Sequence, residues 1–123
     1  MTLRAKQARF ARLISQHIAW IFARGYEVTL ADGGVTLLRK VQTTDGRIQR
    51  AIDREHMDGS LHYARLAQDL NLFMNGEWIT DGSHPAWLEI GLHWEGMDPE
   101  CRWGGRFEKP DANHFSLAHE GRA

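Results

Sequence analysis

Cysteine is nearly missing from this chain: Cys101 is the only one in 123 residues, so no disulfide can form within it. A lone thiol is typical of a protein that folds in a reducing cytoplasm. No Cys-His pattern surrounds Cys101, which argues against a thiol nucleophile. Long apolar runs are missing as well, because Lys, Arg, Gln and His interrupt residues 1–27. The sequence therefore predicts neither a signal peptide nor a membrane span.

An excess of charge of either sign is also missing. Lys and Arg total 15 and Asp and Glu total 16, which gives a net charge of −1. Such a chain has no basic surplus to neutralise phosphates, so we expect no nucleic-acid partner. Its apolar share of 42% and charged share of 25% are those of an ordinary globular protein. The length predicts one domain over residues 1–123.

A helix is predicted near the start of the chain. Apolar residues recur at three- and four-residue steps from Leu3 to Ala23, the spacing of a helix with one buried stripe. Gly25 suits the position just after the end of such a helix. His17 lies beside the stripe, and we interpret it as a packed helix residue rather than a metal ligand.

Short strands and turns follow. The alternating stretch 66–74 and the Asn75-Gly76 pair predict a hairpin into residues 77–79. Ser83, His84 and Pro85 are typical of a helix start, and we expect that helix to run to about Gly96. Further elements are expected as a strand at 26–30, turns at 32–34 and 43–46, a strand at 35–42, a short helix or loop at 47–59, and a last strand at 114–117. This mixture predicts an α+β fold with a small antiparallel sheet and packed helices.

Two separated segments carry candidate metal ligands. Residues 60–73 contain His62 and Asp69, and residues 110–117 contain Asp111 and His114. Two imidazoles and a carboxylate form a ligand set for catalytic zinc, and a further carboxylate can take a proton from water. Seven His and sixteen acidic residues also make some proximity expected by chance. On spacing alone, both interpretations stay open.

Tryptophan is abundant, with five residues in the chain. Four of them lie in its last half: Trp78, Trp87, Trp94 and Trp103. Core packing is one interpretation and a groove lined with aromatic side chains is the other.

The two segments resemble the signatures of the M15 family of zinc peptidases, the D-alanyl-D-alanine peptidase group. The stretch SLHYARLAQDL is similar to the pattern S-x-H-x-x-G-x-A-x-D, with Arg65 where glycine is usual. The stretch WGGRFEKPDANHFSL is similar to the ending W-G-G-x-W/F followed by D-x-x-H-F. Small M15 endopeptidases of phages and prophages, which serve as endolysins, are the most similar members.

The resemblance implies a Hedgehog/DD-peptidase-like fold with a zinc ion held by His62, Asp69 and His114. It also implies that Asp111 is the general base, acting on a water whose pKa the zinc lowers to about 7.

The substrate side of the site departs from the family pattern. The family's substrate-binding Arg has no match at its usual place, and Arg39 is the nearest substitute, although a surface charge is its other interpretation. Ser60 is expected either to bond substrate or a ligand, or to close a turn.

The expected function is zinc-dependent hydrolysis of the peptidoglycan stem peptide, as an L-alanyl-D-glutamate endopeptidase endolysin of a phage or prophage. We expect a monomer made in the cytoplasm of the host bacterium and released by a holin to act on the cell wall. The alternatives are a D-Ala-D-Ala carboxypeptidase or dipeptidase, and a non-catalytic zinc protein that binds the cell wall.

Overall fold

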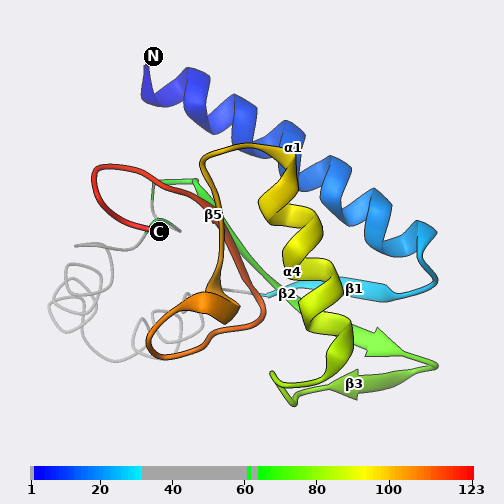
Figure 1. The fold of residues 1–123 in the computed structure, drawn as a ribbon. Coiled ribbons are helices and arrows are strands. Elements are labelled where there is room, and N and C mark those ends of the chain that lie inside the picture. The colour runs from blue at the N-terminus through cyan, green and yellow to red at the C-terminus, as the bar shows by residue number, and fades with distance from the viewer. Residues whose placement is uncertain (1, 32–60, 62–63) are drawn as a thin grey trace, which may run out of the picture.

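The computed structural model describes residues 2–31, 61 and 64–123, and these residues form two α-helices and a five-stranded antiparallel sheet (Figure 1). The predicted α+β class with a small antiparallel sheet and packed helices is therefore confirmed. The turns, strand and charged segment predicted between residues 32 and 59 lie outside the described residues. Neither of the two described helices is long and apolar enough to cross a membrane.

Helix α1 spans Leu3–Ala23, the range that the apolar spacing predicts. Thr2 caps its start, since the Thr2 side chain accepts a hydrogen bond from the Ala5 N–H at 3.1 Å. Gly25 follows its end with φ of +92°, a conformation in which glycine avoids the strain of a side chain. The stripe that α1 buries consists of Phe10, Leu13, His17 and Ile21.

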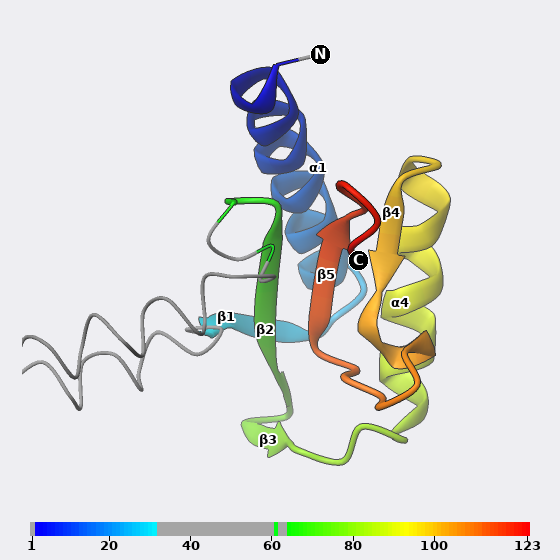
Figure 2. The same ribbon diagram turned by 90° about the vertical axis from the view of Figure 1, so that its left-hand side faces the viewer.

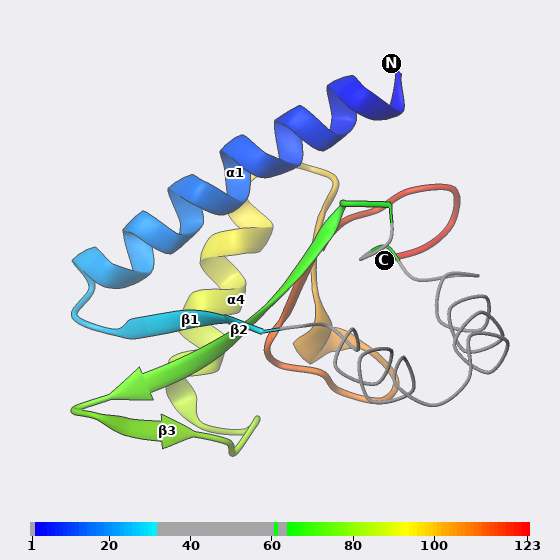
Figure 3. The ribbon, with the colours of Figure 1, turned by 180° about the vertical axis from the view of Figure 1, so that it is seen from behind.

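The sheet has the strand order β1-β2-β5-β4, and every pairing in it is antiparallel. Its strands are β1 (Glu27–Ala31), β2 (Ala67–Met74), β3 (Glu77–Ile79), β4 (Cys101–Trp103) and β5 (His114–Leu117). Strand β3 pairs with β2 through the predicted hairpin (Figure 3), whose Asn75 and Gly76 have φ of +53° and +80°. Positive φ at both turn residues is typical of the tight turn that Asn-Gly favours. The last strand has the predicted bounds, whereas β4 was not predicted as a strand.

Strand β2 is the centre of the sheet. One of its edges pairs with β1 along residues 69–73. Its other edge is shared: β5 pairs with residues 67–69, and β3 pairs with residues 72–74 (Figure 2). Between these two neighbours, residues 70 and 71 are outside both ladders on that edge. The partial exception is the Leu70 N–H, which donates to the Asn113 carbonyl at 2.9 Å.

Helix α4 spans Pro85–Met97 and begins as predicted, with His84 as its N-cap and Pro85 in its first turn. The His84 ring nitrogen Nδ1 accepts a hydrogen bond from the Ala86 N–H at 3.1 Å. The helix directs Trp94 into the core, where the ring lies 5.9 Å from Phe10 of α1 and 6.1 Å from Phe115 of β5.

The two faces of the sheet have different partners. Leu70, Leu72 and Phe115 are all fully buried, and Phe115 contacts the aromatic rings of both helices. Because successive side chains of a strand point to opposite faces, Asp69 and His114 lie on the face turned away from the helices. Alternation of the side chains along β2 and β5 thus gives the sheet one face that packs in the core and one face that carries Asp69 and His114.

Candidate metal centre

Asp69 and His114 are direct partners across the β2–β5 ladder. His114 Nδ1 lies 3.2 Å from Asp69 Oδ1, within hydrogen-bond or ion-pair distance. His114 is 7% exposed and Asp69 is half-buried. Residues directly opposite each other on one face have close Cβ atoms, so the strand register itself brings the imidazole to the carboxylate.

Asp111 joins this pair from the loop before β5. One donor atom from each of Asp69, Asp111 and His114 lies within 4.8 Å of the other two. The Asp111 backbone carbonyl accepts the His114 N–H at 3.1 Å, so the two residues share one turn. The Asp111 side chain is exposed, in contrast to His114. The group therefore has a buried side at the sheet and an open side at Asp111.

Gly104 makes the close approach of this loop possible. A Cβ on Gly104 would overlap the Asp111 carbonyl oxygen and lie 2.8 Å from the His114 Cβ. The Gly104 carbonyl also accepts the Asp111 N–H at 2.8 Å. A glycine at this position is thus a steric requirement of the group, because only a residue without a Cβ lets the two backbone segments approach so closely.

Two aromatic rings fix the same loop. The Trp103 indole N–H donates to the Ala112 carbonyl at 2.7 Å, a bond between buried partners. The Phe107 ring lies 5.3 Å from the His114 ring and covers it. Residues from two further segments therefore restrict the positions of Asp111 and His114, as a preorganised site requires.

The donor set fits a divalent transition metal. Imidazole nitrogen and carboxylate oxygen both bind zinc at about 2.0–2.2 Å, so two donors on one tetrahedral ion lie roughly 3.2–3.6 Å apart. The 3.2 Å between His114 Nδ1 and Asp69 Oδ1 falls in that range. The donor atoms of all three residues lie within 4.8 Å of one another, a wider spacing than that of two donors on one ion. Rotation of the exposed Asp111 side chain changes the distances to its carboxylate. The set also suits other divalent ions that accept nitrogen and oxygen ligands.

Three of the predicted site residues, Arg39, Ser60 and His62, lie outside the described residues. The described residues beside them are anchored. Leu61 is 3% exposed, its carbonyl accepts the Leu66 N–H at 2.9 Å, and Gln7 of α1 donates to the Ala64 carbonyl at 2.8 Å. The chain just before β2 is therefore held against α1 and the core.

Arg65 adopts a left-handed backbone with φ of +58°. This is the position at which the zinc peptidase signature has glycine. A non-glycine residue in this region costs roughly 1–2 kcal/mol, because its Cβ crowds the following carbonyl. The backbone here thus has the conformation that glycine would adopt without strain.

A pair of histidines lies away from the candidate metal centre and was not predicted. His17 of α1 and His93 of α4 place their Nδ1 atoms 2.9 Å apart, with nearly coplanar rings. His17 is fully buried, and burial together with the nearby His93 lowers the pKa of His17 to about 3. The expectation that His17 is a packed helix residue agrees with its burial. The partner lies 76 residues away in the sequence, so no local pattern could identify it.

Cys101 does not act as a nucleophile in this setting. Its side chain is 4% exposed, and burial raises the pKa of the thiol to about 12. The thiolate form is therefore scarce at neutral pH.

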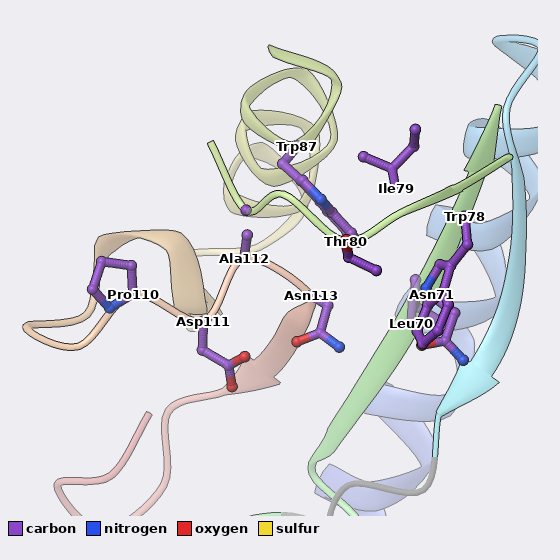
Figure 4. Close-up of a pocket in the computed structure, with 11 residues that line it drawn as sticks. Leu70, Asn71, Trp78, Ile79, Thr80, Trp87, Pro110, Asp111, Ala112 and Asn113 are labelled. Carbon is purple, nitrogen blue, oxygen red and sulfur yellow. The ribbon is translucent and has the colours of Figure 1, made fainter. Parts of the chain in front are cut away.

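A pocket of about 320 Å³ adjoins the metal-binding group and shares Asp111 with it (Figure 4). It lies where the edge of β2 passes from β5 to β3, with Asn71 and Trp78 on the β2–β3 side and Asp111 and Asn113 on the loop before β5. Trp87, Trp94 and Trp103 are buried, whereas Trp78 is 57% exposed. Trp94 and Trp103 thus pack in the core, Trp87 is buried and also lines the pocket, and Trp78 forms an exposed wall of it.

Comparison of the chain with protein-family models, with curated proteins and with solved structures gives no significant match.

Proposed function

We propose that the protein is a zinc-dependent peptidase that hydrolyses the peptidoglycan stem peptide, most specifically the bond between L-alanine and D-glutamate. The observation that carries this proposal is the pairing of Asp69 with His114, with the Asp111 carboxylate at the open side of the same group. The left-handed backbone at Arg65 adds support, because it matches the glycine position of the M15 signature.

In this proposal Asp69 and His114 hold the ion together with His62. A zinc ion bound there would polarise the scissile carbonyl and lower the pKa of a coordinated water. The in-register pairing of β2 with β5 keeps the His114 and Asp69 donor atoms side by side before substrate arrives.

Asp111 acts as the general base. Its carboxylate is exposed and lies within 4.8 Å of the ligand atoms, and backbone hydrogen bonds with Gly104 and His114 hold the Asp111 main chain in place. It takes a proton from the attacking water and gives it to the nitrogen of the leaving amine. The proton is thus transferred between oxygen and nitrogen without leaving the site.

The bond cleaved is tested by mass analysis of fragments from purified murein. New amino termini on D-glutamate are the expected result. Release of free D-alanine would instead identify the carboxypeptidase alternative, and intact murein in the presence of stoichiometric zinc would contradict hydrolysis altogether and favour a non-catalytic zinc protein. Lysis of cells from inside only when a holin is co-expressed would support the role of a phage or prophage endolysin.

A further inference from the structure

The pocket beside Asp111 lies at the edge of β2, and residues of β2, of β3 and the turn after it, of α4 and of the loop before β5 line it. Residues 70 and 71 lie between the β5 and β3 ladders, and the opposite wall is the loop 110–113. Its volume of about 320 Å³ is within the range of pockets that hold small ligands. Since Asp111 belongs both to this wall and to the metal-binding group, whatever fills the pocket lies next to the bond that is hydrolysed.

The polar side chains of this pocket are uncharged apart from Asp111. Asn71, Asn113 and Thr80 supply two carboxamides and a hydroxyl, which can donate as well as accept hydrogen bonds. Asn71 is oriented by its neighbour strand, because its Nδ2 donates to Thr29 Oγ1 at 3.2 Å. No described lining residue is cationic, and the Asp111 carboxylate places a like charge beside any acidic ligand. The pocket therefore favours a neutral ligand rich in hydroxyl and amide groups.

Trp78 adds an aromatic wall. Its indole is 57% exposed although it comes from the sheet, and it stacks on Phe73 of β2 with 6.5 Å between ring centroids. An exposed apolar side chain alone needs no explanation. Here, however, the indole borders amide groups beside a candidate catalytic carboxylate, and Figure 4 shows Trp78 and Asn71 together on one side of the pocket. A flat ring next to uncharged hydrogen-bonding groups suits the C–H face and the hydroxyls of a sugar.

We propose that this pocket is a subsite for the N-acetylated sugar that carries the stem peptide, an inference that rests on the proposed function. In peptidoglycan this sugar is joined through a lactyl amide to L-alanine, the residue on the amino side of the bond to D-glutamate. The sugar, the lactyl group and L-alanine are all uncharged there, as the pocket requires. The anionic D-glutamate then lies on the other side of the scissile bond, outside the pocket.

The test compares two substrates that differ only in the N-acetylated sugar: an N-acetylmuramoyl tripeptide, and the D-lactyl tripeptide of the same sequence, whose amino end is also uncharged. We expect wild-type protein to favour the muramoyl substrate in kcat/KM by about 10-fold, the range of an aromatic contact of roughly 1.4 kcal/mol. Trp78→Ala should reduce that ratio to about 2-fold or less, and Trp78→Phe should restore most of it. Phe22→Ala removes an aromatic side chain of α1 that is 48% exposed, and it should leave the ratio unchanged.

Equal kcat/KM for the two substrates in wild-type protein would overturn the sugar subsite and leave the proposed function in place. If neither substrate is hydrolysed, the proposed function fails. Binding of the uncharged N-acetylmuramoyl-L-alanine amide then decides the subsite separately. A shift of the indole N–H signal that is missing in Trp78→Ala would support the subsite, and an unshifted signal at saturating ligand would overturn it.

Discussion

His114 and Asp69 face each other in register across two antiparallel strands, with 3.2 Å between His114 Nδ1 and Asp69 Oδ1. The two residues are 45 positions apart in the sequence, so the pairing of β2 with β5 is what makes them neighbours. Their face of the sheet is turned away from the helices, and the loop that carries Asp111 closes on it. The proximity of these two candidate metal ligands is thus a consequence of strand register.

Asp111 is expected to be the base rather than a ligand. Asp111→Asn keeps the shape of the side chain and its backbone hydrogen bonds but removes the charge that accepts a proton. We expect kcat on murein fragments to fall by about 10²- to 10⁴-fold while zinc affinity changes less than roughly 10-fold. A steady-state assay with parallel zinc titration measures both. A loss of zinc affinity as large as the loss of rate would make Asp111 a ligand instead.

Gly104→Ala tests the steric requirement of the loop. The added methyl would overlap the Asp111 carbonyl, and Asp111 with its hydrogen bond to His114 would have to move. We expect the free energy of unfolding to fall by about 1–3 kcal/mol and zinc to bind more weakly. Urea denaturation and zinc titration measure the two effects.

Gly96→Ala is the matched control, because a Cβ at Gly96 of α4 meets nothing within 4 Å. There we expect an increase in the free energy of unfolding of about 0.5–1 kcal/mol. Equal stabilities of Gly104→Ala and wild type would contradict the role assigned to Gly104.

Several elements of the fold follow from local patterns in the sequence. The apolar stripe of α1 predicts both of its ends, and Asn75-Gly76 predicts the hairpin, because these signals depend on neighbours within a few residues. The proximity of Asp69, Asp111 and His114 was predicted only through the resemblance of the two segments to the M15 signatures, because their spacing alone left it open. No local pattern specifies which strands share the edge of β2, so the pocket beside Asp111 and its wall at Trp78 could not be predicted.

The histidine pair was likewise only partly predictable from local patterns. The position of His17 beside the stripe indicates a packed residue, but its hydrogen bond to His93 depends on how α1 crosses α4. Strand β4 was missed because three residues before a Gly-Gly pair carry little strand signal. His62 and the arginine that would bind substrate are still predictions.

Arg65→Gly should stabilise the protein. The left-handed φ of +58° strains a side chain but not a glycine, and the gain exceeds the entropy that glycine adds to the unfolded chain. We expect the free energy of unfolding to rise by about 0.5–1 kcal/mol in urea denaturation. Arg12→Gly, at an exposed position inside α1, should lower it by about 1 kcal/mol. A drop of similar size for both variants would show that the Arg65 backbone is not strained.

The His17–His93 pair should make stability depend on pH. The pKa of His17 is about 3 in the folded protein and near 6.5 in the unfolded chain. Above about pH 6.5 both states are neutral, and below it the unfolded chain takes up a proton that the folded protein does not. The free energy of unfolding therefore falls as pH drops from about 6.5 towards 3, by up to about 1.4 kcal/mol per pH unit.

His17→Leu removes this term and keeps an apolar side chain in the core. Urea denaturation of both proteins is measured at several pH values between 7.5 and 4.5. The carboxylates titrate in both proteins, so the difference between the two isolates the contribution of His17. The free energy of unfolding of the wild type, minus that of His17→Leu, should fall steadily as pH drops. A difference that does not vary with pH would contradict a neutral, buried His17.

The most direct test of the metal centre is calorimetric titration of metal-free protein with zinc. We expect one ion per chain, and we expect Asp69→Asn and His114→Gln each to weaken binding by more than about 100-fold. Glu108→Gln neutralises an exposed carboxylate outside the group and should bind zinc as the wild type does. Unchanged affinity in Asp69→Asn and His114→Gln would contradict the account, because the strand pair would then hold no metal.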